Sequence, residues 1–290
     1  MYKNRKIILV SFATNDLSRS IKRLKTQARD SKFYNQVNII TPDELSIENK
    51  DKINFLLKKG KKRGYAYWYW KPLILLEFFK KINDGDILHY MDVGFHINQK
   101  SSKRYKEYIE LLNENDRWLL AFQYKNIDNR FPDFISFPKR EEYKYTKGDL
   151  FDYFNCIGDK EITHSAQFSA GNFFIKKNSR ANNFLLNWID VFEKKFHLID
   201  DTPSEIKNFL NFVENRHDQS VFSILCKKNQ ILPLSAYEFD WAEKNKKRTW
   251  SHILDYPFLA KRDLEYNFLK RFINRQIKNI KRKKRILFNK

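Results

Sequence analysis

Ile87-Leu-His-Tyr-Met-Asp92-Val-Gly94-Phe-His-Ile97 places a charged side chain and a glycine directly after a β-prone, mostly apolar run. The run from Ile87 to Met91 has the pattern of a strand buried in an α/β sheet. A charge at the end of such a strand is costly unless something pairs with it, and ligands of open α/β sheets bind at that end. Asp92 therefore suits a divalent cation that carries substrate phosphates, and Gly94 would let backbone and ligand approach closely. The alternative is a strand that ends in a turn, with Asp92 as a cap.

The N-terminal region predicts two more strands around a helix. Lys6 to Phe12 reads as a buried strand, Leu17 to Arg29 as a helix, and Val37 to Ile40 as a second strand. This β-α-β order favours a parallel sheet and an α/β fold. Further strands are expected over 118–123 and 173–176, and further helices over 45–60, 72–82, 181–195 and 203–228.

The chain divides into one large domain and a basic tail. Residues 1–262 form the predicted domain, and 263–290 the tail. Within the domain, residues 124–163 are polar, aromatic and irregular, which is long for a loop. We expect this stretch to be a lid or an acceptor-binding insertion.

The tail has the pattern of a basic amphipathic helix. From Lys270 to Lys290 there are ten lysines or arginines and no acid. The two faces of the predicted helix are apolar (Phe268, Leu269, Phe272, Ile273, Ile277 and Ile280) and basic (Lys270, Arg271, Lys278, Lys281 and Arg282). Such a helix is typical of a membrane-surface segment. The alternatives are a helix docked on the domain and a nucleic-acid contact.

Composition limits the class of protein. The 290 residues include 56 lysines and arginines against 35 acids, a formal net charge of +21. This excess of positive charge attracts polyanions. A chain rich in Lys, Asn, Ile and Phe also reflects AT-rich codons, however. No zinc-finger spacing, RNP-type aromatic motif or clear helix-turn-helix is present to indicate nucleic-acid binding. Cys156 and Cys226 do not imply a disulfide framework, so a reducing cytoplasm is expected. With no apolar stretch approaching a membrane span, we expect a soluble or peripheral protein.

Two further segments have residue types suited to a nucleotide sugar. Arg63-Gly-Tyr-Ala-Tyr-Trp-Tyr-Trp70-Lys71-Pro72 places aromatic residues beside a lysine at a helix start, where Trp70 could stack on a base or sugar and Lys71 neutralise phosphate. An aromatic core cluster is the alternative. Gln167-Phe-Ser-Ala-Gly171-Asn172 is a turn of small residues before a strand, which would let backbone amides and Asn172 approach a sugar ring.

A third segment, Arg216-His217-Asp218-Gln219-Ser220, places three different polar side chains before an apolar helix. Asp218 is either a helix N-cap or a ligand-binding carboxylate, or both. Because Asn keeps most of the capping ability, Asp218→Asn is expected to lower the reaction rate with little change in melting temperature.

Together these motifs resemble those of GT-A-fold glycosyltransferases of bacterial capsular polysaccharide and lipopolysaccharide synthesis, over roughly residues 5 to 256. The resemblance implies a mixed, mostly parallel sheet flanked by helices. It also implies that Asp92 matches the first aspartate of the Asp-x-Asp motif, which binds a divalent metal (Mn²⁺ or Mg²⁺) and the donor diphosphate, with Gly94 in place of the second aspartate. His252 would supply the C-terminal metal ligand.

The same resemblance assigns the remaining contacts. Asp218 and Gln219 match the Asp-Gln pair that faces donor sugar or acceptor. The other expected contacts are Ser11, Ala13 and Thr14 at the nucleoside, together with Gly171, Asn172 and His217.

The function predicted is transfer of a sugar from a nucleotide-diphosphate sugar to a hydroxyl of a growing bacterial surface glycan. The acceptor would be a glycan or a lipid-linked glycan, and the tail would hold the enzyme on the anionic inner face of the cytoplasmic membrane. No nucleic-acid partner is expected. The alternatives are a non-enzymatic nucleic-acid or anionic-membrane binding protein and a phosphosugar transferase.

Overall fold

The computed structural model describes residues 5–114, 116–127, 131 and 135–261, and in the tail residues 269, 272, 273, 276, 277, 279, 280 and 283. Its centre is a six-stranded sheet in the order β2-β1-β3-β6-β5-β7. The strands are β1 (Ile7–Phe12), β2 (Gln36–Ile40), β3 (Ile87–Met91), β5 (Leu119–Gln123), β6 (Phe168–Lys176) and β7 (Leu234–Ser235).

The sheet is mixed and mostly parallel. β1 pairs in parallel with β2 and β3, and β5 pairs in parallel with β7. β6 lies between β3 and β5 and runs antiparallel to both. β3 and β5 are buried at every position, as their continuous apolar runs predict. The predicted α/β fold class is confirmed, and so is the parallel β-α-β start.

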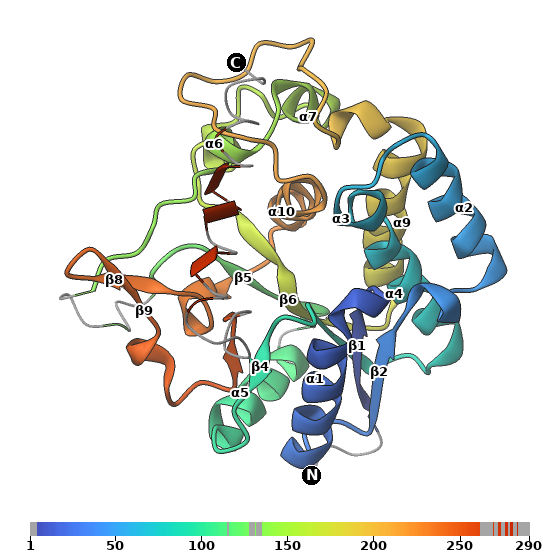
Figure 1. The fold of residues 1–290 in the computed structure, drawn as a ribbon, viewed down its shortest axis with the longest axis vertical. Coiled ribbons are helices and arrows are strands. Elements are labelled where there is room, and N and C mark those ends of the chain that lie inside the picture. Colours follow the sequence, from blue (N-terminus) through green and yellow to red (C-terminus); the bar gives the residue numbers. More distant parts are fainter. Residues whose placement is uncertain are drawn as a thin grey trace.

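Helices cover both faces of the sheet (Figure 1). They are α1 (Ser18–Ser31), α2 (Ile47–Lys58), α3 (Gly64–Tyr67), α4 (Trp70–Lys81), α5 (Ser102–Asn113), α6 (Glu142–Tyr145), α7 (Gly148–Tyr153), α8 (Lys160–Thr163), α9 (Ser179–Lys194) and α10 (Asp218–Lys228). One hydrophobic core joins α4, α9 and α10 to the sheet, and a second joins α1 and α5 to its other face. The sheet is therefore shielded by helices on both sides.

Short strands complete the fold beside the second core. β4 (His96–Ile97) pairs with β10 (Phe258–Leu259), and β8 (Ala242–Lys244) forms a hairpin with β9 (Lys247–Thr249). The segment 124–163 contains α6, α7 and α8, and residues of α7 and α8 reach the first core. Its role as a lid or acceptor insertion stays a prediction.

The helix predicted over 203–228 is wrong for its first half. Only α10 is helical, and 203–217 crosses over α6 and α7 without a regular helix. Its backbone amides bond outside the segment: Val213 N–H donates to Lys144 O at 2.8 Å, and Arg216 N–H to Tyr145 O at 3.0 Å. The Asp149 carboxylate accepts the N–H of Ile206 at 2.6 Å. These partners satisfy the backbone without a helix.

The tail is helical at the positions described. Five of its apolar side chains are between 45% and 67% exposed: Leu269, Phe272, Ile273, Ile277 and Ile280. The predicted basic face (Lys270, Arg271, Lys278, Lys281 and Arg282) and Phe268 lie outside the described residues. Within the described part of the chain, no helix has the length and apolar character needed to span a membrane.

The short segment α3, together with Trp68, is a left-handed turn that joins α2 to α4. Gly64, Tyr65, Ala66, Tyr67 and Trp68 all have positive φ, from 53° to 66°. Left-handed backbone costs roughly 1–2 kcal/mol for each L-residue, so consecutive residues in this region are rare. The turn directs Tyr67 and Trp68 to the His217 side chain, with ring centroids at 5.0 and 5.7 Å.

Gly64→Ala should destabilise the protein more than Gly60→Ala. Both glycines have positive φ, but a β-carbon at Gly64 would lie 2.5 Å from the Trp68 ring, whereas one at Gly60 meets nothing within 4 Å. We expect Gly60→Ala to cost about 1 kcal/mol of unfolding free energy and Gly64→Ala at least twice that. Chemical denaturation of both variants measures the difference. Equal losses would show that the Trp68 ring does not constrain position 64.

Candidate functional site

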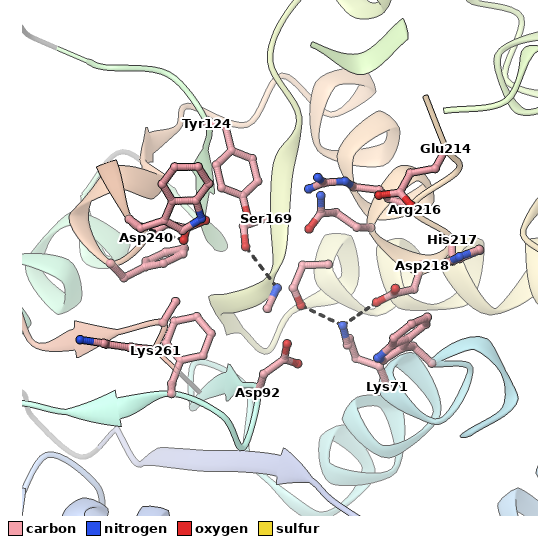
Figure 2. Close-up of a pocket in the computed structure, with 18 of the residues that line it drawn as sticks. Lys71, Asp92, Tyr124, Ser169, Glu214, Arg216, His217, Asp218, Asp240 and Lys261 are labelled. Carbon is pink, nitrogen blue, oxygen red and sulfur yellow. Dashed lines mark hydrogen bonds and ion pairs between the residues drawn. The ribbon is translucent and has the colours of Figure 1, made fainter. Parts of the chain in front are cut away.

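A pocket of about 610 Å³ lies at the edge of the sheet where β3 ends (Figure 2). The residues directly after β3 and β5, the first residues of the antiparallel strand β6 and the start of α10 contribute to it. Ligands of open α/β sheets bind at the carboxyl ends of the strands, as β3 and β5 show here. The lining residues include Arg63, Trp68, Lys71, Asp92, Tyr124, Ser169, Ala170, Gly171, Glu214, Arg216, His217, Asp218, Gln219, Asp240, Trp241, Arg248, Trp250 and Lys261.

A buried ion pair forms one wall of the pocket. Lys71 Nζ lies 2.5 Å from Asp218 Oδ2 and donates a second hydrogen bond to Ala170 O at 3.0 Å. Both side chains are buried. The pair joins the start of α4 to the start of α10 through β6. Lys71 stands at a helix start, where a cation is electrostatically unfavourable, and Asp218 compensates for its charge.

Asp218 has a strongly perturbed pKa. Burial raises the pKa of this carboxyl to about 6, and the charge of Asp92 adds to the rise, while Lys71 opposes it. The capping interpretation of Asp218 is wrong, because the N-cap of α10 is His217, whose side chain makes no capping hydrogen bond. A carboxylate with this pKa is suited to exchanging protons near neutral pH.

His217 is held rigidly behind the pair. Its Nδ1 hydrogen-bonds with Ile199 O, and the ring stacks on Trp68 with an interplanar angle of 16°. Burial, with the charge of Arg63, lowers its pKa to about 4, so the ring is neutral at pH 7. His217 therefore supports the wall without adding charge.

Asp92 lines the pocket directly after β3. Its N–H donates to Gly171 O at 2.9 Å, and the Tyr90 hydroxyl donates to Asp92 Oδ1 at 2.7 Å. A β-carbon at position 171 would lie 3.1 Å from Asp92 Oδ2, so glycine there leaves room for the carboxylate. The strand-end carboxylate predicted from sequence thus faces a pocket, together with Gly171.

The donor set suits a cation that brings ligands of its own. Among the described residues, no group of three or more His, Cys, Asp or Glu side chains is placed to hold a metal ion. Asp92 brings a carboxylate into the pocket directly after β3, and Mg²⁺ is commonly held by one or two carboxylates plus substrate phosphates. Asp92 fits that mode of binding.

The predicted pairing of Asp92 with His252 is wrong in this structure. His252 does not line the pocket, and its Nε2 lies 3.1 Å from Tyr237 O. Its ring packs against Phe131 and Phe137, with centroids at 5.4 and 5.6 Å. This aromatic environment makes it a structural histidine.

Asn172 and Trp70 also lie away from the pocket. Asn172 Oδ1 is 2.6 Å from His89 Nε2 on the other face of the sheet, because successive residues of β6 point to opposite faces. The Trp70 indole N–H donates to Gly64 O at 3.0 Å, and its ring stacks on Phe12 at 4.2 Å. The predicted roles of both residues are corrected: each is buried in a core.

The other predicted contacts divide into two groups. The first group lines the pocket: Lys71, Asp92, Gly171, His217, Asp218 and Gln219. The Gln219 amide N–H donates to Gln167 Oε1 at 2.8 Å. Ser11, Ala13, Thr14 and Gly94 are not among the residues that line it. Ser11 and Ala13 are buried. The first loop therefore does not contribute to this pocket.

Sequence reasoning missed the wall opposite Lys71. Tyr124 follows β5, Trp241 and Trp250 flank the β8–β9 hairpin, and Arg248 lies in β9. The Arg248 guanidinium carbon is 4.3 Å from the Trp241 ring centroid. The available signal was a run of four basic residues over 244–248 between two tryptophans, since a cation over an aromatic face is a favourable pair.

Comparison with known proteins gives distant likenesses only. No family model and no curated protein matches the chain. Similar solved structures include a glycosyltransferase involved in glycosylation of the major capsid of PBCV-1, at 9% identity and TM-score 0.46, covering 94% of this chain and 99% of that chain. Mouse xyloside xylosyltransferase 1 is 11% identical, with a TM-score of 0.41, and the match covers 81% of this chain and 73% of that chain. The galactosyltransferase LgtC, in complex with donor and acceptor sugar analogs, is 12% identical, with a TM-score of 0.40, and the match covers 92% of this chain and 94% of that chain. These values are too low to assign an activity.

Asp218→Asn should destabilise the protein, contrary to the expectation from sequence. The substitution leaves the buried Lys71 ammonium without a counter-charge, which typically costs 3–5 kcal/mol. Lys71→Met should cost a similar amount by stranding Asp218, and the double variant Lys71→Met/Asp218→Leu should lose less than the sum. Denaturant unfolding of the four proteins measures this coupling. Strictly additive losses would show that the two charges do not depend on each other.

Proposed function

We propose that this protein is a glycosyltransferase that uses a nucleotide-diphosphate sugar. The observation that carries the proposal is the convergence of Asp92, Lys71 and Asp218 in one pocket at the carboxyl ends of the strands. A carboxylate for a phosphate-bound cation and a second carboxylate with a raised pKa are two groups that such a transfer can use. The aromatic residues Trp68, Tyr124 and Trp241 provide flat surfaces for sugar or base.

Asp92 would hold a divalent cation, Mn²⁺ or Mg²⁺, jointly with the donor phosphates. The bound cation would neutralise charge that develops on the leaving nucleoside diphosphate. Lys71 adds positive potential on the same side of the pocket. With a pKa of about 6, Asp218 is mostly ionised at pH 7 and can accept the proton of an acceptor hydroxyl.

The acceptor proposed is a growing bacterial surface polysaccharide, of capsule or lipopolysaccharide type. The pocket is open to solvent along a wall of aromatic and basic side chains, which suits an extended glycan. Support for this finer assignment comes from the sequence motifs and from the chemistry of that wall.

Donor turnover should depend on Asp92. Incubation with a panel of nucleotide sugars, with and without MnCl₂, should release a nucleoside diphosphate. Asp92→Asn should lower this release by about 10²-fold or more, the usual cost of removing a key electrostatic group. Asp51→Asn, at an exposed carboxylate on α2, is the matched control and should retain wild-type release. A folded Asp92→Asn variant with wild-type turnover, or a wild-type protein that turns over no donor, would contradict the proposal.

We propose in addition that the tail places the enzyme on the anionic inner face of the cytoplasmic membrane. The five exposed apolar side chains of the tail helix form a surface that would gain about 25 cal/mol for each Å² buried in lipid. The basic residues of the same segment would add roughly 1 kcal/mol each near an anionic surface. Asn279 of this helix lines the pocket, so membrane contact would lie close to the site of transfer.

Phe272→Ser/Ile277→Ser should weaken sedimentation with anionic liposomes at least tenfold. Both side chains are exposed, so their loss removes lipid contact without opening the core. The double variant keeps Asn279, unlike a truncation of residues 268–290. Leu232→Ser, at an exposed leucine outside the tail, serves as the control. Equal sedimentation of all three proteins, or none by the wild type at low salt, would refute the membrane placement.

A further inference from the structure

His217 occupies a strained turn directly before Asp218 (Figure 2). The Gln219 N–H donates to Arg216 O at 3.1 Å, which closes a four-residue turn with His217 as its second residue. The backbone angles of His217, φ 56° and ψ −119°, are those of this position in a type II′ turn. Glycine is the usual residue there, because a β-carbon raises the energy of a backbone with positive φ. The histidine therefore holds this conformation at a cost.

The side chain of His217 fixes the strained backbone. Its Nδ1 hydrogen-bonds with Ile199 O, and its ring contacts two aromatic rings of the left-handed turn, Tyr67 at a centroid distance of 5.0 Å and Trp68 at 5.7 Å. Only 2% of the residue is exposed. The ring is thus held by a carbonyl on one side of the chain and by aromatic packing from another, and the backbone cannot relax unless these contacts break.

The ring nitrogens are out of reach of a ligand. A carbonyl oxygen only accepts, so Nδ1 carries the proton and Nε2 has the lone pair. Nε2 is buried and has no hydrogen-bond partner among the described residues. The carboxylate oxygen Oδ1 of Asp201, 3.6 Å away, is also an acceptor. Burying an acceptor without a donor costs free energy, so His217 has a second unfavourable feature, which contact with a ligand does not explain.

The conformation of His217 determines where Asp218 lies. The His217 carbonyl accepts from the Ser220 N–H at 3.1 Å and from the Val221 N–H at 3.3 Å, so α10 starts from this residue. Asp218 is the first residue of the helix, and its carboxylate lies 2.5 Å from Lys71 Nζ. With a negative φ at His217, the chain would enter α10 in another direction, and the carboxylate would move away from Lys71.

We propose that His217 is a positioning residue, which holds the Asp218 carboxylate in place for the acceptor hydroxyl through the strained turn. This inference rests on the proposed function, because it takes Asp218 as the group that accepts the proton. Strained residues cluster at sites where a neighbouring group must be fixed before the substrate binds. A carboxylate fixed in this way needs no reorganisation during the reaction, which favours the transition state.

Stability measurements test the strained turn without any assay of transfer. His217→Ala and His217→Gly both remove the ring, but only glycine adopts the turn without strain. His217→Gly should therefore unfold at a higher denaturant concentration than His217→Ala. His197 is exposed and is not among the residues with positive φ, so alanine should be the more stable replacement there. An alanine variant at 217 that is as stable as the glycine variant would overturn the strained turn.

The pKa of the Asp218 carboxyl, followed by carbon-13 NMR, reports its position. Burial raises this pKa to about 6, the charge of Asp92 adds to the rise, and Lys71 opposes it. Because burial is the largest of these effects, a carboxylate released into water should titrate closer to the usual value of about 4. We expect this fall in His217→Ala. In His217→Asn the pKa should stay near 6, because asparagine tolerates positive φ and keeps an N–H donor for Ile199 O. An unchanged pKa in a folded His217→Ala variant would contradict the positioning role.

Kinetics separate positioning from simple packing. His217→Ala should lower kcat at least 30-fold and change KM less than threefold, since the proton is accepted only in the transition state. His217→Asn should keep kcat within about threefold of the wild type. A folded His217→Ala variant with wild-type kcat would make His217 a packing residue only. A wild type that turns over no donor would refute the proposed function, and the pKa measurement would then still decide whether His217 places Asp218.

Discussion

The buried contact between Lys71 and Asp218 is the interaction on which the site depends. It joins two helix starts that are 147 residues apart in sequence, and it uses Ala170 O of β6 as a third point of attachment. An isolated ammonium or carboxylate in this position would be prohibitively costly, so each group fixes the other. The polar wall of the pocket is therefore built from charges that the core tolerates only together.

The pocket combines two electrostatic regions with different roles. On one side, two carboxylates lie near a lysine that compensates one of them. On the other, Arg140 and Arg216 stack on tyrosine rings, and Arg140 is paired with Asp240. A molecule that bridges the two regions would meet hard oxygen ligands at one end and anion-binding donors at the other. Such polarity along one cavity sets the orientation of a ligand as well as its affinity.

Much of the sheet and part of the pocket could be predicted from sequence. The strand 87–91 and the carboxylate after it were identifiable because a continuous apolar run ending in a charge has few structural meanings. The ligand contact predicted for Asn172 was wrong because adjacent residues of a strand face opposite sides of the sheet. The motif alone does not tell whether Gly171 or Asn172 faces the ligand. The stacking role predicted for Trp70 was wrong because the five residues with positive φ, from Gly64 to Trp68, direct Trp68 to the pocket instead. Arg216 belongs to a predicted motif, but its stacking on Tyr145 joins residues far apart in the sequence and could not be predicted from that motif.

The position of β6 has a consequence for how the chain folds during synthesis. This strand is inserted between β3 and β5, which precede it in the chain, so the central sheet has a gap until residue 176 has left the ribosome. Up to that moment β3 and β5 each expose an unpaired edge of apolar strand, which is prone to intermolecular pairing. At roughly 5–20 residues per second, this vulnerable interval after β5 lasts several seconds. The nascent chain would thus need a chaperone most during the synthesis of residues 124–176, well before α10 completes the pocket.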